Sequence, residues 1–318
     1  MSTPKLSVVI PLYNKEPYIA RALRSVCTQT VQDFEIIVVD DGSTDNSAQV
    51  VLSFGDSRIR LIKQENSGQS VARNRGVHES RTELVAFLDA DDEWKPCFLQ
   101  TVLHLKDLFP QAGIYACAYD VIDAGDIKVK YAFVGVPSGD WEGLIPNYFE
   151  TLQGRSPVWS SAVMIPKGVL INCGMFPVGY RYGEDVDTWI RIALQYPIAF
   201  SNVSGAIYHR GTGISLCDQE MPSLEYPFFK TISKVISEGL IDNKSREFLN
   251  EFMNNTLIQA SIFSVLRGQG SVARKNLLNC QTKYFQVKKW KWIFLSFVPV
   301  VVLKWLSKWN HSLKVLVK

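Results

Sequence analysis

The sequence predicts an α/β fold with a doubly wound, mostly parallel sheet, followed by a helical region. The first observation is that short, near-continuous apolar runs alternate with helical patterns in the first part of the chain. Such runs are typical of strands buried on both faces, as in a parallel sheet. The second observation is that the pattern from Pro222 onward is helical. The four runs cover residues 6–10, 35–39, 59–62 and 84–88.

The segments between these runs carry helical spacing and helix-start signals. Behind Pro17, which suits a first helical position, apolar residues recur at i, i+3, i+4 and i+7. These residues are Ile19, Ala22, Leu23 and Val26. Natural caps precede a second and a third helix, namely Ser43, Thr44 and Asp45, and then Ser67. The resulting β-α-β-α-β-α-β order predicts a parallel sheet with helices on both faces.

The middle of the chain is more mixed. Strands are expected within residues 113–136, around a turn at 124–126. The patterns that follow predict a helix at 141–150, a strand at 159–165, a helix at 184–195 and a strand at 198–208.

Composition excludes several classes of protein. The 318 residues are 47% hydrophobic and 20% charged, which argues against a disordered or collagenous chain. The cysteines are scattered without a C-x-x-C pair, as is typical of reduced thiols in a cytoplasmic protein. They are Cys27, Cys97, Cys117, Cys173, Cys217 and Cys280. The N-terminal residues do not resemble a secretory signal, so a cytoplasmic location is expected.

Polar residues follow each of the four predicted strands. In open α/β sheets, ligands collect at the carboxyl ends of the strands. Residues 11–14 read PLYN, 40–43 read DDGS, 64–68 read QENSG and 89–92 read DADD. These segments contain acids and amides in place of a glycine-rich phosphate loop. Nucleotide binding through a P-loop or a dinucleotide-binding fingerprint is therefore excluded.

Asp89 and Asp91 form a D-x-D pattern that suits a hard divalent cation. Mg²⁺ and Mn²⁺ prefer oxygen ligands, and Mg²⁺ commonly combines one or two carboxylates with substrate phosphates and water. Such an ion would take up the charge that develops on a diphosphate leaving group. Taken alone, the same acids also fit a simpler role as caps of a turn and the helix that follows it.

Five motifs in order give a more specific signal. SVVIPLYN, IIVVDDGSTDNS, NSGQSVARNRG, FLDADDEW and GEDVDTWIR together resemble glycosyltransferase family 2, the inverting enzymes of the GT-A fold. The resemblance covers about residues 5–215. It implies a GT-A catalytic domain over 1–215, with a nucleotide-sugar half at about 1–92 and an acceptor half at about 93–215. Residues 216–318 form the C-terminal helical region.

The resemblance implies roles for the residues of the donor half. Tyr13 would stack on the nucleobase in a pocket that Pro11 lines, and planar rings suit this contact. Asp41 would accept hydrogen bonds from the base, while Asp40 shapes the turn beside it. Arg73 would face the diphosphate, since a guanidinium binds phosphate oxygens well. The expected donor-binding set is Pro11, Tyr13, Asn14, Asp40, Asp41, Asn66, Arg73, Asp89 and Arg210.

The acceptor half would supply the catalytic base. An inverting transfer needs a carboxylate that removes the proton of the acceptor hydroxyl. Asp185 resembles the family's base, and Glu184 would orient the acceptor or Asp185, whereas Asp187 should face elsewhere on the helix. Asp91 would bind Mn²⁺ or Mg²⁺, and Asp89 would bind either the ribose or the metal ion. His209 is either a further metal ligand or a structural histidine.

The end of the chain is basic and apolar. After Glu251 there are eleven Lys or Arg residues and no acid. Residues 292–303 are too short an apolar run to span a membrane. A helix from Pro299 would place cations on one stripe and Trp and Leu residues opposite. Residues 288–318 are therefore expected to form an amphipathic segment on an anionic membrane surface, or else to pack on the protein body or a partner. Nucleic acid is not an expected partner.

These inferences combine into a prediction of activity. The chain would move one sugar from a nucleotide-diphosphate sugar, a UDP-hexose or UDP-N-acetylhexosamine, to a hydroxyl of a saccharide or lipid-linked saccharide. The pathway would be the biosynthesis of a cell-surface polysaccharide, at the inner face of the membrane. Single transfer is favoured because no Q-x-x-R-W follows the Glu-Asp pair at the spacing of processive synthases. The alternatives are a membrane-tethered sugar-nucleotide binder without catalysis and a sugar nucleotidyltransferase. Self-association stays open.

Overall fold

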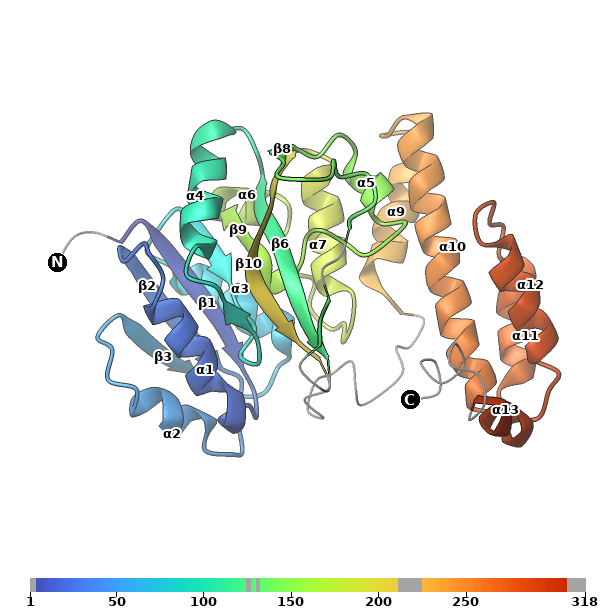
Figure 1. Cartoon of the computed structure of the whole chain (residues 1–318), viewed down its shortest axis with the longest axis horizontal. Coiled ribbons are helices and arrows are strands. Elements are labelled where there is room, and N and C mark those ends of the chain that lie inside the picture. Colours follow the sequence, from blue (N-terminus) through green and yellow to red (C-terminus); the bar gives the residue numbers. More distant parts are fainter. Residues whose placement is uncertain (1–3, 124–126, 130–131, 211–224, 308–318) are drawn as a thin grey trace. The chain divides into compact units, whose positions relative to one another are not determined.

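A computed structural model describes residues 4–123, 127–129, 132–210 and 225–307 (Figure 1). The chain divides into two compact units. The first comprises Met1–Gln219 with Tyr226–Lys234, and the second comprises Glu220–Glu225 with Val235–Lys318. The expected turn at 124–126, the start of the helical pattern at Pro222 and the cations from Lys308 onward lie outside the described residues.

The first unit contains one mixed sheet in the order β3-β2-β1-β4-β9-β6-β10-β5. The four strands of its first half are parallel and agree with the four apolar runs. They are β1 (Leu6–Leu12), β2 (Phe34–Asp40), β3 (Ile59–Lys63) and β4 (Leu84–Phe87). Every residue of β1 and β2 is buried, as expected for central strands covered on both faces.

Helices connect these parallel strands as predicted. They are α1 (Glu16–Cys27), α2 (Ser47–Leu52) and α3 (Gln69–Glu79). The four apolar residues predicted for the first helix are all fully buried. The predicted caps are wrong by one to three residues: α2 starts after Asn46 and α3 after Gly68, whose φ of 94° suits glycine. Asp45 still contributes to the start of α2, because it accepts a hydrogen bond from the Ser47 backbone.

The second half of the sheet mixes directions. β9 (Val163–Pro166) runs antiparallel between β4 and β6 (Ile114–Asp123), and β10 (Ile198–His209) is parallel to β6. Short strands β5 (Glu93–Trp94), β7 (Ile127–Val129) and β8 (Glu142–Leu144) pair antiparallel. The other elements here are α4 (Phe98–Leu108), α5 (Tyr148–Thr151), η1 (Ser160–Ala162), α6 (Lys167–Asn172) and α7 (Glu184–Ala193).

The helix predicted at 141–150 is wrong. Residues 142–144 form β8, in which Gly143 pairs with Phe200 of β10. Pro146 lacks the backbone N–H that a helix interior needs, and a helix begins only after Asn147. The Asn147 side chain accepts hydrogen bonds from the backbone N–H groups of Phe149 and Glu150, so it is the N-cap of this helix.

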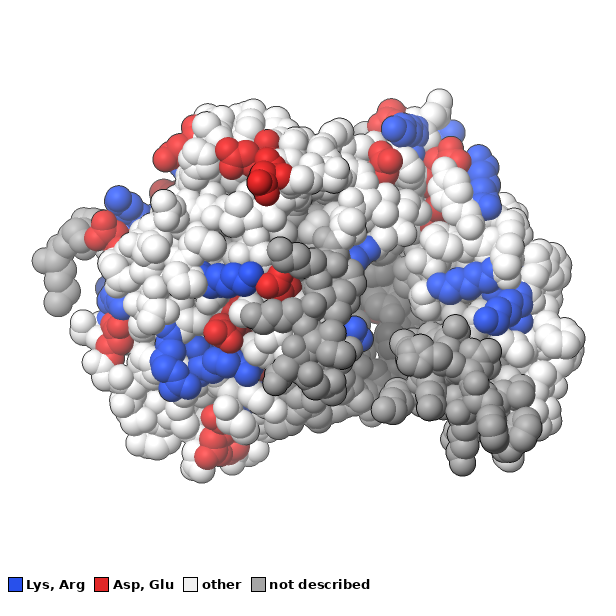
Figure 2. All heavy atoms as spheres, viewed as in Figure 1, with Lys and Arg blue, Asp and Glu red and all other residues white. Residues whose placement is uncertain are grey.

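The second unit is helical, as predicted. It takes the last residues of α9 (Pro227–Ser237) and contains α10 (Asn243–Leu266), α11 (Gly270–Asn279), α12 (Gln286–Leu295) and α13 (Val300–Ser307). These helices enclose an apolar core of their own. In Figure 2, basic groups lie among uncharged residues on this unit. Within the described ranges, no helix is both long and apolar enough to cross a bilayer.

Candidate active site

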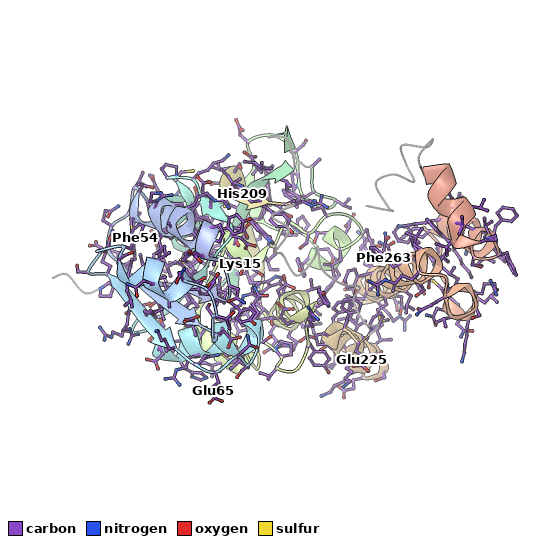
Figure 3. The ribbon with its side chains drawn as sticks, turned by 90° about the horizontal axis from the view of Figure 1, so that it is seen from below. Lys15, Phe54, Glu65, His209, Glu225 and Phe263 are labelled. Carbon is purple, nitrogen blue, oxygen red and sulfur yellow. The ribbon has the colours of Figure 1, made fainter. Side chains whose placement is uncertain are left out.

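The carboxyl ends of the parallel strands meet at one edge of the sheet. Leu12 at the end of β1 is paired with Asp40 at the end of β2, which in turn is paired with Lys63 at the end of β3. The loops that leave these ends carry the residues predicted to bind the donor. Lys15, after β1, and His209, at the end of β10, are labelled in Figure 3.

Asp41 holds two of these loops together. Its carboxylate is buried and accepts hydrogen bonds from the backbone N–H groups of Ser67 (3.0 Å) and Gly68 (2.8 Å). The Gln64 side-chain amide donates to it as well, at 2.7 Å. The next residue, Gly42, has φ of 76° and approaches the Asn66 backbone so closely that a Cβ would lie 2.9 Å from its nitrogen. The whole carboxylate therefore positions the β3–α3 loop, and its expected contact with a base stays a prediction.

The β1 and β2 loops are joined in the same way. The Asn14 side-chain oxygen accepts a hydrogen bond from the Thr44 backbone at 2.8 Å, and Asp40 accepts one from the Ser43 backbone at 3.0 Å. Asn14 itself has a positive φ of 50°, which asparagine tolerates better than most residues. Tyr13 beside it is 46% exposed, so its ring is accessible to a planar ligand. Pro11 is buried within β1, and Asn66 is exposed.

Arg73 on α3 connects the two halves of the unit. Its side chain is only 2% exposed, and its guanidinium donates to Asp89 (2.8 Å) and to Glu184 (3.0 Å). The ring of Phe176 lies 5.4 Å from the guanidinium carbon. Burial alone would lower the pKa of Arg73, but the charges of Asp89 and Glu184 outweigh it and raise that pKa. The structure shows that Arg73 ties the D-x-D segment to the Glu184–Asp185 pair, while its expected contact with a diphosphate stays a prediction.

Two serines form a second connection between the same segments. Ser161 accepts a hydrogen bond from the Asp89 backbone at 3.0 Å, and its hydroxyl donates to Asp92 at 2.7 Å. The hydroxyl of the neighbouring Ser160 donates to Asp185 at 3.1 Å. Because η1 carries both serines, the D-x-D segment and Asp185 are anchored to the same short turn.

Cations surround the second aspartate of the D-x-D pattern. The Lys15 ammonium lies 2.5 Å from the Asp91 carboxylate, and the Arg21 guanidinium donates to the Asp91 backbone oxygen at 2.5 Å. Asp92 is buried, and burial, followed by the charge of Asp91, raises its pKa well above the usual range. Its carboxylate accepts a hydrogen bond from the His209 backbone at 3.2 Å, which brings the end of β10 next to the D-x-D segment.

The catalytic candidates lie in the first turn of α7. Gly183 precedes them with φ of 75°, and a Cβ there would come within 2.8 Å of the Phe228 ring. Glu184 is buried, and burial together with the charge of Asp185 raises its pKa to about 7, although Arg73 opposes that shift. Asp185 is only partly buried. Asp187 points elsewhere, as predicted, because it binds Arg191 (2.7 Å) and Thr231 (2.5 Å).

The sequence model of glycosyl transferase family 2 matches residues 7–176, more than half of the chain. The chain belongs to glycosyl transferase family 2. The matched range includes the D-x-D segment and ends before Glu184 and Asp185. The role of Asp185 as the catalytic base of this glycosyltransferase therefore stays a prediction.

Relatives and solved structures agree with this family. An uncharacterized glycosyltransferase of Nostoc sp. is 29% identical and is matched over 95% of this chain and 89% of its own length. Glycosyltransferase GlyA of Streptococcus pneumoniae is 42% identical over 54% of this chain, but only 25% of GlyA is covered. The crystal structure of S. aureus TarS 1-349 in complex with UDP-GlcNAc gives a TM-score of 0.61 at 21% identity. It matches 90% of this chain and 78% of that one, which shows that the fold is GT-A.

The predicted metal site has few carboxylates among the described residues of the glycosyltransferase. Among them, no group of three or more His, Cys, Asp or Glu side chains is arranged to hold a metal ion. A cation shared with a diphosphate needs only one or two carboxylates, which Asp91 and Asp89 would supply. His209 has its ring nitrogen 3.2 Å from Glu93, and burial, then Arg21, lowers its pKa. The carboxylates of Asp91 and Asp89 thus fit a metal ion that protein and substrate hold jointly.

Several residues of this site were missed by sequence reasoning. They are Lys15, Arg21, Gln69, Asp92, Ser160 and Ser161. Lys15 comes directly after the PLYN segment that follows the first predicted strand, which is a signal that could have found it. The serines lie in a turn without periodicity, so only the fold brings them to the site. Of the predicted residues, Arg210 is exposed, and its backbone N–H donates to Ile122 at 2.9 Å.

Proposed function

We propose that the protein moves a single sugar from a UDP-hexose or UDP-N-acetylhexosamine to a hydroxyl group, with inversion at the anomeric carbon. The acceptor is a lipid-linked saccharide in the biosynthesis of a cell-surface polysaccharide. The C-terminal region binds anionic lipid at the cytoplasmic face of the membrane. The UDP-GlcNAc bound to the similarly folded TarS supports a UDP-sugar as donor.

The observation that carries the proposal is the double connection between the D-x-D segment and the Glu184–Asp185 pair. Arg73 bridges Asp89 and Glu184, while the turn with Ser160 and Ser161 contacts both Asp185 and the D-x-D segment. A sugar transfer needs donor and base in one place, because the reacting atoms must approach to about 3–3.5 Å.

The chemistry assigns a role to each of these groups. Asp185 takes the proton of the acceptor hydroxyl while the oxygen of that hydroxyl bonds to the anomeric carbon. The bond from that carbon to the diphosphate breaks, and the nucleoside diphosphate leaves. Glu184, held by Arg73, orients Asp185 or the acceptor. Mn²⁺ or Mg²⁺, held by Asp91 with Asp89 and His209 as further candidates, would neutralise charge on the leaving diphosphate.

The test is the Asp185→Asn variant, which keeps the size of the side chain but removes the base. Transfer from UDP-sugars should fall by about 10²- to 10⁴-fold, as for loss of a general base, while UDP binding measured by calorimetry stays within threefold of wild type. The matched control is Asp107→Asn, since the Asp107 side chain is 75% exposed on α4. Normal turnover by Asp185→Asn would contradict the assignment. A wild-type protein that binds UDP-sugars but neither transfers nor hydrolyses them would identify a binder without catalysis.

A further inference from the structure

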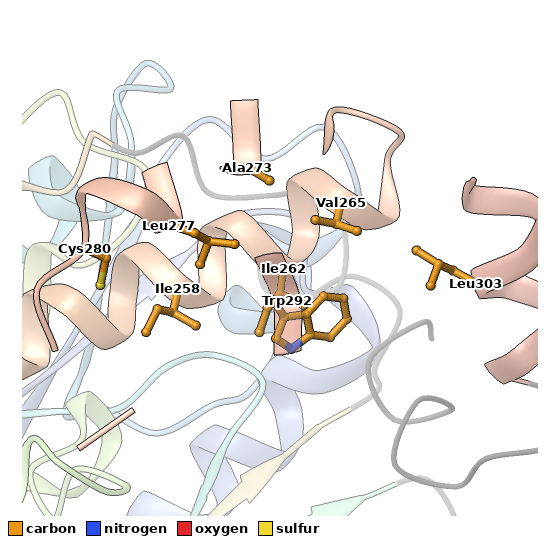
Figure 4. Close-up of a cluster of buried hydrophobic side chains, with 8 residues drawn as sticks. All are labelled: Ile258, Ile262, Val265, Ala273, Leu277, Cys280, Trp292 and Leu303. Atoms are coloured by element: carbon orange, nitrogen blue, oxygen red, sulfur yellow. The ribbon is translucent and has the colours of Figure 1, made fainter. Parts of the chain in front are cut away.

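One helix of the C-terminal unit is apolar on two opposite faces. The inner face of α12 carries Trp292, which is buried in the core of that unit (Figure 4), and Lys289, whose ammonium donates to the Cys280 backbone oxygen at 2.6 Å. The outer face carries Val287, Trp290 and Phe294 at i, i+3 and i+7. A surface helix in water normally turns polar residues outward, so this outer face needs a partner.

Exposed apolar residues continue along the chain past the end of α12, so that they form a stripe in the sequence. It consists of five residues that are 57–86% exposed: Val287, Trp290, Phe294, Phe297 and Val301. We call these residues the outer stripe. Phe297 lies in the turn after α12, and Val301 lies in the first turn of α13. Trp292 and Leu303 are buried. Within the segment 288–318 that was expected to face lipid, some apolar residues therefore belong to the core of the unit and others lie on its surface.

The corner between α12 and α13 is fixed against α11. Arg274 donates to the Ser296 backbone oxygen at 2.7 Å, and its guanidinium lies 4.2 Å from the centre of the Phe297 ring. At Gly270, a Cβ would come within 2.3 Å of that same Ser296 oxygen, so the two segments approach closely. The outer stripe is therefore presented by a packed corner and not by a loose end.

Charge identifies the chemistry of the partner. Lys291 is exposed on α12 one turn after Val287, Lys275 is exposed on α11, and no acid occurs after Glu251. Two copies of such a face would bring like charges together, which disfavours a symmetric dimer. Exposed aromatic and aliphatic residues among lysines suit the headgroup region of an anionic bilayer.

We propose that the outer stripe inserts into the headgroup region of an anionic lipid bilayer, with Lys291 contacting lipid phosphates. This inference rests on the membrane attachment included in the proposed function and assigns it to the α12–α13 corner. It differs from the helix predicted from Pro299, whose cations from Lys308 onward lie outside the described residues.

The test uses full-length protein and sedimentation with phosphatidylcholine vesicles, with and without about 30 mol% phosphatidylglycerol. Wild type should bind the anionic vesicles, and less so as salt rises from about 0.1 to 0.5 M. Phe294→Ser with Phe297→Ser should lower the partition coefficient about tenfold or more at unchanged circular dichroism. The matched control is Leu52→Ser with Leu108→Ser, two exposed leucines of the first unit, and it should bind as wild type.

Three results would overturn the proposal. The stripe variant could bind within about threefold of wild type, or the control could lose as much binding as the stripe variant. The stripe variant could also convert a wild-type dimer to a monomer in sedimentation velocity without changing vesicle binding, which would make the stripe a contact between copies. Asp185→Asn separates this proposal from the catalytic one, because it should bind vesicles as wild type whatever its turnover.

Discussion

Arg73 shows how a single buried charge can organise a site. Removing a guanidinium from water is costly unless carboxylates and hydrogen bonds compensate for it. Here Asp89 and Glu184 each accept a hydrogen bond from it, and they come from opposite halves of the first unit. Because the fork of a guanidinium fixes the angle between its partners, Arg73 also fixes the D-x-D segment relative to α7.

Glu184 gives the protein a pH-dependent stability with a defined sign. Burial and Asp185 raise its pKa from 4.5 to about 7, so between these values the folded state binds more protons than the unfolded state. The contribution of Glu184 to stability is therefore fully present below about pH 4.5 and is lost as the pH rises through about 7. The loss should be at most about 3 kcal/mol.

The Glu184→Gln variant cannot titrate and should lack this loss. Relative to wild type, its free energy of unfolding in urea should increase between pH 4.5 and pH 8. Glu238→Gln, which removes an exposed carboxylate, sets the background of the measurement. A difference between Glu184→Gln and wild type that stays constant over this pH range would show that folding does not shift the pKa of Glu184.

At the scale of the element, α3 packs against β1 through a glycine. A Cβ on Gly76 would lie 2.3 Å from a Val9 methyl carbon, so alanine requires the helix or the strand to shift. Gly76→Ala should lower the free energy of unfolding by about 1–3 kcal/mol, as overpacking does, and should reduce activity because α3 carries Arg73. Gly168→Ala in α6 is the control, since its Cβ would meet nothing within 4 Å. Equal stabilities of the two variants would contradict this packing.

The elements also show what the sequence could and could not predict. The strands of the parallel half and the first turn of α7 were predictable, because continuous apolar runs and clustered acids are local signals. The segment that forms β8 and α5 was not predictable, because its apolar residues fit both the helical and the strand period. Pairing with β10 decides that residues 142–144 form a strand. The contact between Ser160 and Asp185 joins residues 25 apart through a turn, so no local pattern encodes it.

At the scale of the whole molecule, the two units differ in the residues they hold. The first unit holds every residue predicted to bind donor or perform catalysis, and the second is the basic, apolar part. The sequence predicted the domain boundary at 215/216. In the structure, Tyr226–Lys234 belongs to the first unit, whereas Glu220–Glu225 and Val235–Lys318 belong to the second. In the proposed function, the basic second unit would attract anionic lipid, while the carboxylates of the first unit would attract a metal ion.

Coupling between metal and nucleotide should be measurable on the intact protein. If a cation is shared by Asp91 and a diphosphate, UDP binds tightly only with Mn²⁺ or Mg²⁺. UDP at about 100 times its dissociation constant would then stabilise the folded state by about 2.7 kcal/mol. The melting temperature should rise by about 5 °C or more with UDP and Mn²⁺ together, and by much less with UDP and EDTA. In Asp91→Asn, which removes the carboxylate paired with Lys15, the effect of Mn²⁺ on UDP binding should disappear, whereas Asp107→Asn should retain it. An equal rise with UDP in Mn²⁺ and in EDTA would show that UDP binding needs no metal ion.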